Sequence, residues 1–326
     1  MKPVKLGIIG SNFVADWLAE AVGMTEGIIL HAMYSRTRET GESFANKYEI
    51  PNVYTDLEGF LSSDIDAVYI ASPNLFHAPQ AMAAMEKGKH VLVEKPAALT
   101  EAQFQEMADC AKKNGVVLLE AMRPAHDRAL TDIQKSITEI GTIRRAVLEF
   151  CQYSSRYDKF RDGEIMNAFN PALGNAAVMD IGVYAIAVSV LLFGAPKGIV
   201  SRSVLLSNGF EGMGTALLDY GTHQAEIVYS KITDSVNPSV ITGEDGSVKI
   251  GKLSTFDSLT RCMRKKEPEI IFSGRETAGA GNMVYEVENF VKMIAGDRKV
   301  DDYTEVTLRT LRIIDEIRRQ NSIEFS

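Results

Sequence analysis

The sequence is poor in the residues that build disulfide scaffolds and metal sites. Its 326 residues include three cysteines, Cys110, Cys151 and Cys262, which are far apart and never form a C-x-x-C pair. An odd number of scattered cysteines argues against a disulfide framework and against a zinc knuckle. The five histidines show no H-x-x-x-H or mixed Cys/His spacing, so we expect no metal site.

The sequence also lacks the charge and hydropathy patterns of nucleic-acid-binding and membrane proteins. Its formal net charge is −8 and its Lys and Arg residues are scattered, so no basic stripe is there to neutralise a phosphate backbone. We expect no apolar run of the roughly 20 residues that cross a bilayer, and the N-terminus shows no signal-peptide pattern. We therefore expect a cytoplasmic protein without membrane or nucleic-acid partners.

The spacing of the apolar runs predicts two domains. Up to about residue 122, runs such as IDAVYIAS and KHVLVEKP alternate with helix-length segments, which is typical of strands buried on both faces of a parallel sheet. Later runs such as GTALLDY and HQAEIVYS are joined by short turns, which indicates a largely antiparallel sheet. The fold class is thus α/β, with a doubly wound Rossmann domain followed by an α+β domain with a large, open, mostly antiparallel sheet.

We place the dinucleotide-binding domain at residues 1–122 and a domain for substrate binding and oligomerisation at residues 123–326. One long apolar helix, AAVMDIGVYAIAVSVLLFG, interrupts the strands of the second domain. The last helix, at about residues 304–320, is expected to be able to pack back on the first domain. Because one face of an open sheet needs covering, we expect a homodimer or a homotetramer.

The turn after the first apolar run has the pattern of a phosphate-binding turn. In GIIGSNFVADW, the G-x-G-x-x-G/A frame falls on Gly10, Asn12 and Ala15, with Phe13 in the same turn. The first position makes the tight turn, and the second lets backbone approach a pyrophosphate. Asn tolerates the left-handed conformation, and its amide is able to donate to phosphate. We therefore expect an altered phosphate contact at Asn12; an ordinary strand-to-helix turn is the alternative.

The end of the second predicted strand favours NADP over NAD. An NAD-binding domain places an acidic residue there to hold the ribose. This chain instead has Ser35, Arg36, Thr37 and Arg38, whose hydroxyl and guanidinium groups suit a 2′-phosphate. A solvated basic turn is the alternative, and NAD is the second choice of cofactor.

Two later segments carry groups suited to proton transfer. Lys95 lies in VEKP, where the fifth strand ends, and a lysine held against a cofactor and excluded from water can exchange a proton with a substrate hydroxyl. Asp180 and Tyr184 lie at i and i+4 of the apolar helix, so they share one face. A structural hydrogen-bonded pair and a surface lysine are the alternatives.

Together these motifs resemble those of the Gfo/Idh/MocA oxidoreductases. The E-K-P step at Lys95 and the D-x-x-x-H/Y step, with Tyr184 in place of His, are the most specific parts of a likeness over nearly the whole chain. VMDIGVY looks most like the NADP-dependent dihydrodiol and aldose dehydrogenase branch. The departures at Asn12, at Gly174-Asn175-Ala176 and at Arg123-Pro124 put the substrate in doubt more than the chemistry.

The resemblance implies hydride exchange between nicotinamide C4 and a hydroxyl-bearing carbon of a small sugar, polyol or vicinal diol. It implies that Lys95 relays a proton, that Tyr184 is its partner or the acid/base itself, and that Asp180 orients the substrate or the lysine. Five further residues would line the cofactor groove: Ser72, Pro73, Asn74, His77 and Glu94. A nucleotide-binding regulator without turnover and an NAD-dependent glycoside hydrolase of the same family remain alternatives.

The stretch CQYSSRYDKFRDGEIMNAFNP, residues 151–171, concentrates Tyr, Arg and Lys side chains shortly before the apolar helix. A loop of this kind can close over a polyol or an anionic substrate. An exposed charged connection or a subunit contact explains the same composition equally well.

Overall fold

The computed structural model describes residues 2–275 and 279–325, which form two compact units. The first unit contains the described residues up to Ala121 and those from 279 to Thr307. The second contains those from Met122 to 275 and from Leu308 onward. The structure thus differs from the predicted division at residue 122, because a late segment folds with the first unit, and the boundary at Thr307 falls inside helix α11 (Asp301–Asn321).

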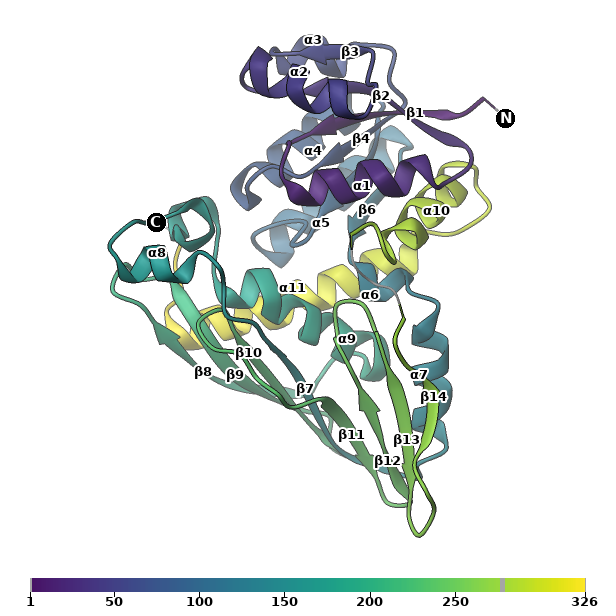
Figure 1. The fold of residues 1–326 in the computed structure, drawn as a ribbon, viewed down its shortest axis with the longest axis vertical. Helices are drawn as coiled ribbons and strands as arrows, with labels where there is room; N and C mark the ends of the chain where they lie inside the picture. The colour runs from purple at the N-terminus through teal and green to yellow at the C-terminus, as the bar shows by residue number, and fades with distance from the viewer. Residues whose placement is uncertain (1, 276–278, 326) are drawn as a thin grey trace. The chain divides into compact units, whose positions relative to one another are not determined.

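The first unit is built on a six-stranded parallel sheet of order β3-β2-β1-β4-β5-β6 (Figure 1). This order reverses direction between β1 and β4, as in Rossmann domains, and it confirms the predicted fold of the N-terminal half. The strands are β1 (Val4–Ile9), β2 (Ile28–Tyr34), β3 (Asn52–Tyr54), β4 (Ala67–Ile70), β5 (His90–Glu94) and β6 (Leu118–Ala121).

Most helices of the first unit begin with a side-chain N-cap. Asn12, Thr37, Asp56 and Thr100 each accept a backbone N–H from the first turn of the helix that follows, which satisfies donors that have no partner inside the helix. The helices are α1 (Phe13–Gly23), α2 (Arg38–Lys47), α3 (Leu57–Leu61), the 3₁₀ turn η1 (Asn74–Phe76), α4 (His77–Glu86) and α5 (Glu101–Asn114).

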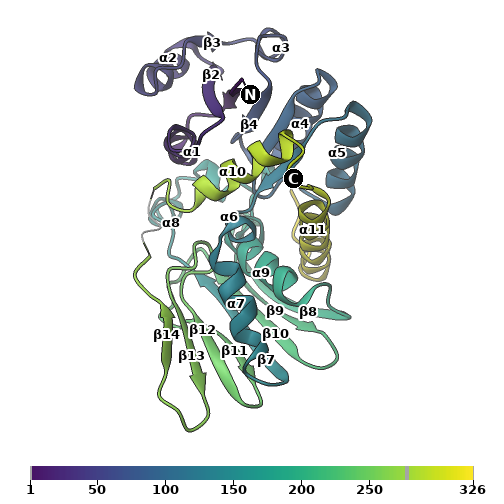
Figure 2. The ribbon, with the colours of Figure 1, turned by 90° about the vertical axis from the view of Figure 1, so that its right-hand side faces the viewer.

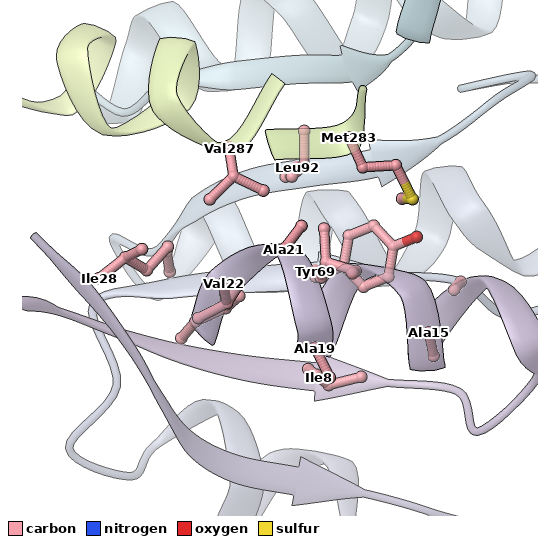
Figure 3. Close-up of a cluster of buried hydrophobic side chains, with 14 of the residues drawn as sticks. Ile8, Ala15, Ala19, Ala21, Val22, Ile28, Tyr69, Leu92, Met283 and Val287 are labelled. Carbon is pink, nitrogen blue, oxygen red and sulfur yellow. The ribbon is translucent and has the colours of Figure 1, made fainter. Parts of the chain in front are cut away.

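Helix α10 (Met283–Ile294) explains why a late segment belongs to the first unit. Its residues Met283, Val287 and Phe290 are spaced as one helical stripe, and all three are buried in the same core as Leu18 and Val22 of α1. Figure 3 shows Met283 and Val287 pointing toward α1 and toward Tyr69 of β4. The apolar side of α1 is therefore covered by residues that lie far away in the sequence.

The second unit is built on an eight-stranded sheet of order β14-β13-β12-β11-β7-β10-β9-β8. β7 and β10 pair in parallel, and the other neighbouring strands pair antiparallel. This confirms the mostly antiparallel sheet. The strands are β7 (Ile143–Cys151), β8 (Gly198–Leu205), β9 (Glu211–Asp219), β10 (Gln224–Ser230), β11 (Ser239–Gly243), β12 (Gly246–Ile250), β13 (Leu259–Met263) and β14 (Glu269–Phe272).

Helices cover one face of this sheet, with α9 against β7 and β10 and α7 against β12 (Figure 2). The helical elements of the unit, besides the end of α11, are α6 (Arg123–His126), α7 (Ala129–Thr138), α8 (Tyr157–Arg161), the 3₁₀ turns η2 (Asn167–Phe169) and η3 (Pro171–Leu173), the π-helical turn η4 (Val178–Gly182) and α9 (Val183–Phe193).

The expectation that no apolar run is long enough to span a bilayer is wrong in its literal form. The helical region Pro171–Phe193 has 23 residues and a mean hydropathy of 2.2 over its most apolar window. However, 72% of that window is buried inside the protein. Its apolar character is that of a core helix, since the sheet and neighbouring helices of the second unit pack around it.

A buried carboxylate fixes the start of this core helix. Glu211 of β9 is fully buried, and its Oε2 accepts the N–H of Val178 at 2.7 Å. Its Oε1 accepts the hydroxyls of Tyr229 at 2.7 Å and of Ser203 at 2.6 Å. Burial raises the pKa of Glu211, and these three donors act against that shift. The Tyr229 ring is held so that it lies directly against Gly182.

Replacing Gly182 by Ala should destabilise the second unit. A Cβ at this position would lie 3.0 Å from the Tyr229 ring, and the ring cannot retreat because its hydroxyl is bonded to Glu211. We expect G182A to lower the free energy of unfolding by about 1–3 kcal/mol, the usual cost of overpacking, as measured by urea denaturation. The matched control is G23A in α1, where a Cβ meets nothing within 4 Å. A G182A protein as stable as G23A would contradict the packing argument.

Candidate active site

The turn after β1 depends on Gly10. Its φ of +107° belongs to a region that residues with a side chain rarely adopt. A Cβ there would also lie 2.6 Å from the carbonyl oxygen of Ala71, at the end of β4. The turn therefore brings the backbone of β1 against that of the neighbouring strand, and only glycine allows this approach.

Asn12 has a different local role from the one its position suggested. Its φ is −82°, which is extended and not left-handed. Its Oδ1 accepts the N–H groups of Val14 and Ala15, both at 3.0 Å, and its Nδ2 donates to Ala71 at 3.0 Å. The expected left-handed conformation of Asn12 is therefore wrong, since its side chain caps α1 and binds the end of β4. A contact between its amide and a phosphate stays a prediction. Phe13, next in the turn, has a side chain that is 50% exposed.

The end of β2 presents one cationic side chain. Ser35 is buried, and its N–H donates to Tyr54 at 3.0 Å. Arg38 is paired with Glu42 at 3.1 Å, one turn further along α2. Arg36 is exposed and forms no ion pair with any residue that the structure describes. Because Thr37 caps α2, Arg36 directly precedes the positive end of a helix, an arrangement that favours anions.

His77 joins the turn after β4 to the turn after β5. It is 1% exposed, with Nε2 at 2.7 Å from the Ser72 carbonyl oxygen and Nδ1 at 2.9 Å from that of Pro96. Burial lowers the pKa of His77, and the two carbonyl oxygens act in the opposite direction. Its ring nitrogens face these backbone oxygens, so a direct contact with a cofactor stays a prediction. Pro73 is exposed at the same turn, and Asn74 is half-buried.

Lys95 is half-buried, and the backbone on both sides of it is held in place. Before it, Glu94 accepts the hydroxyl of the buried Tyr69 at 2.5 Å. After it, the Lys95–Pro96 peptide bond is cis, and the carbonyl of Pro96 faces His77. The ammonium group therefore projects from a turn whose path is fixed by buried side chains.

Glu120 completes this support. It is buried at the end of β6, where Oε1 accepts the N–H of Ala97 at 2.8 Å and Oε2 accepts the hydroxyl of Thr307 in α11 at 2.8 Å. Burial raises the pKa of Glu120, partly offset by these two donors. Glu120 thus ties the E-K-P turn to the helix that ends the first unit.

In the second unit, Asp180 and Tyr184 interrupt a buried surface. Every residue from 176 to 190 is buried except these two, which are half-buried. The ring of Tyr184 lies 5.6 Å from that of Phe150 in β7. The two polar groups thus share the accessible side of the helix, as their i, i+4 spacing predicts.

The structure adds one functional candidate that sequence reasoning missed. Lys231, directly after β10, places Nζ 2.6 Å from Oδ2 of Asp180. The sequence signal was weak: a lysine after an apolar strand, in IVYSKI, normally lies on the surface.

The polar loop before the helix contains its own aromatic stack. The ring centroid of Tyr157 lies 5.7 Å from that of Phe169. The Phe169 centroid lies 4.7 Å from that of Phe210, the residue directly before β9. The exposed polar groups of α8 pair locally, since Asp158 accepts from Tyr153 at 2.6 Å and lies 3.5 Å from Arg161. The loop is thus anchored by its aromatic residues, and its charges face solvent.

Comparison with known proteins supports the family resemblance over the whole chain. The model of the oxidoreductase family with an NAD-binding Rossmann fold matches residues 4–122. The scyllo-inositol 2-dehydrogenase (NADP(+)) IolU of Bacillus subtilis (strain 168) is 40% identical over 325 residues, which are 99% of this chain and 98% of that protein. The trans-1,2-dihydrobenzene-1,2-diol dehydrogenase of Xenopus tropicalis is 27% identical over 229 residues, 67% of this chain and 66% of that protein.

Among solved structures, the fold is shared with KijD10, a 3-ketoreductase from Actinomadura kijaniata in complex with NADP and TDP-benzene. The TM-score is 0.85 at 20% identity, with 98% of both chains covered. The likeness to the Bacillus protein, which extends over both units at 40% identity, confirms the relationship inferred from the E-K-P and D-x-x-x-Y motifs. The chain belongs to the Gfo/Idh/MocA family of NAD(P)-binding oxidoreductases.

Proposed function

We propose that this oxidoreductase is an NADP-preferring dehydrogenase or reductase of a small polyhydroxylated substrate, a cyclic polyol, sugar or vicinal diol. The observation that carries the proposal is the accessible Asp180–Tyr184 pair on an otherwise buried helix. The names of the relatives, an inositol dehydrogenase that uses NADP and dihydrodiol dehydrogenases, agree with this substrate class.

The residues of the first unit fit a dinucleotide with a 2′-phosphate. The tight turn at Gly10, together with Asn12 and Phe13 at the start of α1, suits a pyrophosphate beside a helix N-terminus. Ser35 and the exposed Arg36 suit the 2′-phosphate. Ser72, Pro73 and Asn74 would line the rest of the groove, whereas His77 and Glu94 would act by holding the turns in place.

In the proposed reaction, this chain's residues manage the proton. When bound, the nicotinamide supplies or accepts the hydride at C4. In the oxidative direction, the substrate hydroxyl gives its proton to the neutral amine of Lys95 or to the phenolate of Tyr184, and in the reductive direction the resulting ammonium or phenol returns it. Asp180 would accept a hydrogen bond from a neighbouring hydroxyl and so orient the reacting carbon.

A substrate screen tests the proposal. Purified protein is mixed with NADP and scyllo-inositol, other polyols, aldoses or trans-diols, and the absorbance of reduced nicotinamide is followed. We expect turnover with at least one of them. Binding of NADP without any turnover would favour a regulator, and sugar release from glycosides without net NADPH formation would favour a glycoside hydrolase.

Replacing Lys95 by Met removes the ammonium group and keeps the length of the side chain. We expect a loss of about 10² to 10⁴ in kcat, the usual contribution of a positioned acid/base group, with the dissociation constant of NADPH nearly unchanged. K113M, at an exposed lysine of α5, is the control and should keep full activity. Full activity of the K95M variant would remove Lys95 from the mechanism.

Replacing Arg36 by Ala should weaken NADP binding much more than NAD binding. Loss of a charge-assisted hydrogen bond costs about 1.5–3 kcal/mol, so we expect a rise of roughly 10- to 100-fold in the dissociation constant of NADP, measured by titration calorimetry. R145A is the matched control, because Arg145 is an exposed arginine of β7 in the second unit. Equal weakening of NAD and NADP would contradict a 2′-phosphate contact at Arg36.

The proposal also includes a cytoplasmic homo-oligomer. Edge strand β8 exposes Val200, Val204 and Leu205, which are 65%, 48% and 43% exposed. The end of α11 covers part of the backbone edge of β8, since the N–H groups of Ser201 and Ser203 donate to Gln320 and Asn321. The apolar side chains of β8 that remain in solvent suit burial against another copy of the chain. Sedimentation velocity should therefore give a dimer or tetramer, and a V200K variant should weaken it. A wild-type monomer at micromolar concentration would contradict this part.

A further inference from the structure

Lys231 is the buried half of an asymmetric ion pair. Its side chain is 6% exposed, whereas that of its partner Asp180 is 41% exposed. Some pairs of the same unit are open at both ends, as with Lys159 and Glu164 at 53% and 62%, but Arg261 is also largely buried, at 14%, against the exposed Glu139 and Glu269. The pair therefore has a dry cationic end inside the unit and an accessible carboxylate end.

The ammonium group of Lys231 is held from several directions. Besides Asp180, it donates to the carbonyl of Ala168 at 3.2 Å. It lies 5.2 Å from the ring of Phe169 and 5.5 Å from that of Phe210, within the range of cation–π attraction. These neighbours exclude water but carry no negative charge. Among the residues that the structure describes, Asp180 is the carboxylate paired with this cation.

The backbone beneath Asp180 has a separate anchor. Asp180 lies in the π-helical turn η4, a type of turn that often occurs at functional sites. The N–H of Val178, in the same turn, is held by Glu211. Glu211 thus positions the backbone of the turn, while Lys231 contacts the carboxylate itself, and the two roles can be separated by mutation.

We propose that Lys231 is a positioning residue for the reaction. By binding Oδ2, it fixes the rotamer of Asp180 and compensates its charge, so that the carboxylate is held ready to orient a substrate hydroxyl. This inference rests on the proposed role of Asp180 in catalysis. Lys231 itself acts through Asp180 and exchanges no proton with the substrate.

The kinetic test compares K231M, D180N and the double variant D180N/K231M. We expect K231M to lower kcat about 10- to 100-fold with the dissociation constant of NADPH within two-fold of the wild-type value, because the lysine supports only the substrate side. In the D180N background, K231M should cost less than three-fold, because the group through which it acts is already absent. K249M, at an exposed lysine of β12, is the control for a Lys-to-Met change.

Thermal unfolding tests the Asp180–Lys231 ion pair independently of turnover. In D180N, the Lys231 ammonium stays buried without its carboxylate, which is strongly unfavourable. Removing that stranded charge should restore stability, so D180N/K231M should melt at a higher temperature than D180N. Thermal unfolding of the four proteins gives this comparison even if one single variant folds poorly.

The outcomes separate this inference from the proposed function. Wild-type protein that turns over no polyol, sugar or diol contradicts the proposed function, while the melting temperatures still report on the ion pair. An active wild type with undiminished kcat in K231M overturns the positioning role. Kinetic losses that multiply in the double variant, or a double variant that melts below D180N, overturn it as well.

Discussion

A buried carboxylate must find hydrogen-bond donors, and this requirement shapes both units. Glu120 meets it with the N–H of Ala97 and the hydroxyl of Thr307, and Glu211 meets it with the N–H of Val178 and two hydroxyls. In each case one donor is a backbone group within two residues of a proposed functional side chain. The hydrogen bonds that each buried carboxylate requires thereby fix the backbone close to Lys95 in the first unit and close to Asp180 in the second.

The first unit uses the side chains of an asparagine and a histidine in the same way. Asn12 connects the start of α1 to the end of β4, and His77 connects the ends of β4 and β5. These contacts hold the loops at the carboxyl edge of the parallel sheet, where ligands of such sheets bind. A site assembled on restrained backbone loses little entropy when it takes up its ligand.

Patterns within one segment could be predicted from the sequence. The strand runs predicted the parallel and antiparallel sheets, and the spacing of Asp180 and Tyr184 predicted their shared accessible face. Contacts between distant segments could not. Lys231 and Asp180 meet only because β10 lies against the helix. The sequence of α10 shows an apolar stripe, but it does not show which hydrophobic core the stripe packs into. Asn12 was a missed local signal, since asparagine before a helix is a common N-cap.

The place of α10 in the first unit has a consequence for biogenesis. The core around α1 includes Met283, Val287 and Phe290, so a ribosome must translate most of the message before that core can close. Until then, the nascent Rossmann half leaves the apolar flank of α1 open, and exposed flanks of this kind attract chaperones or neighbouring chains. The core of the N-terminal half can therefore be completed only after α10, the helix before the last one in the chain, has been synthesised.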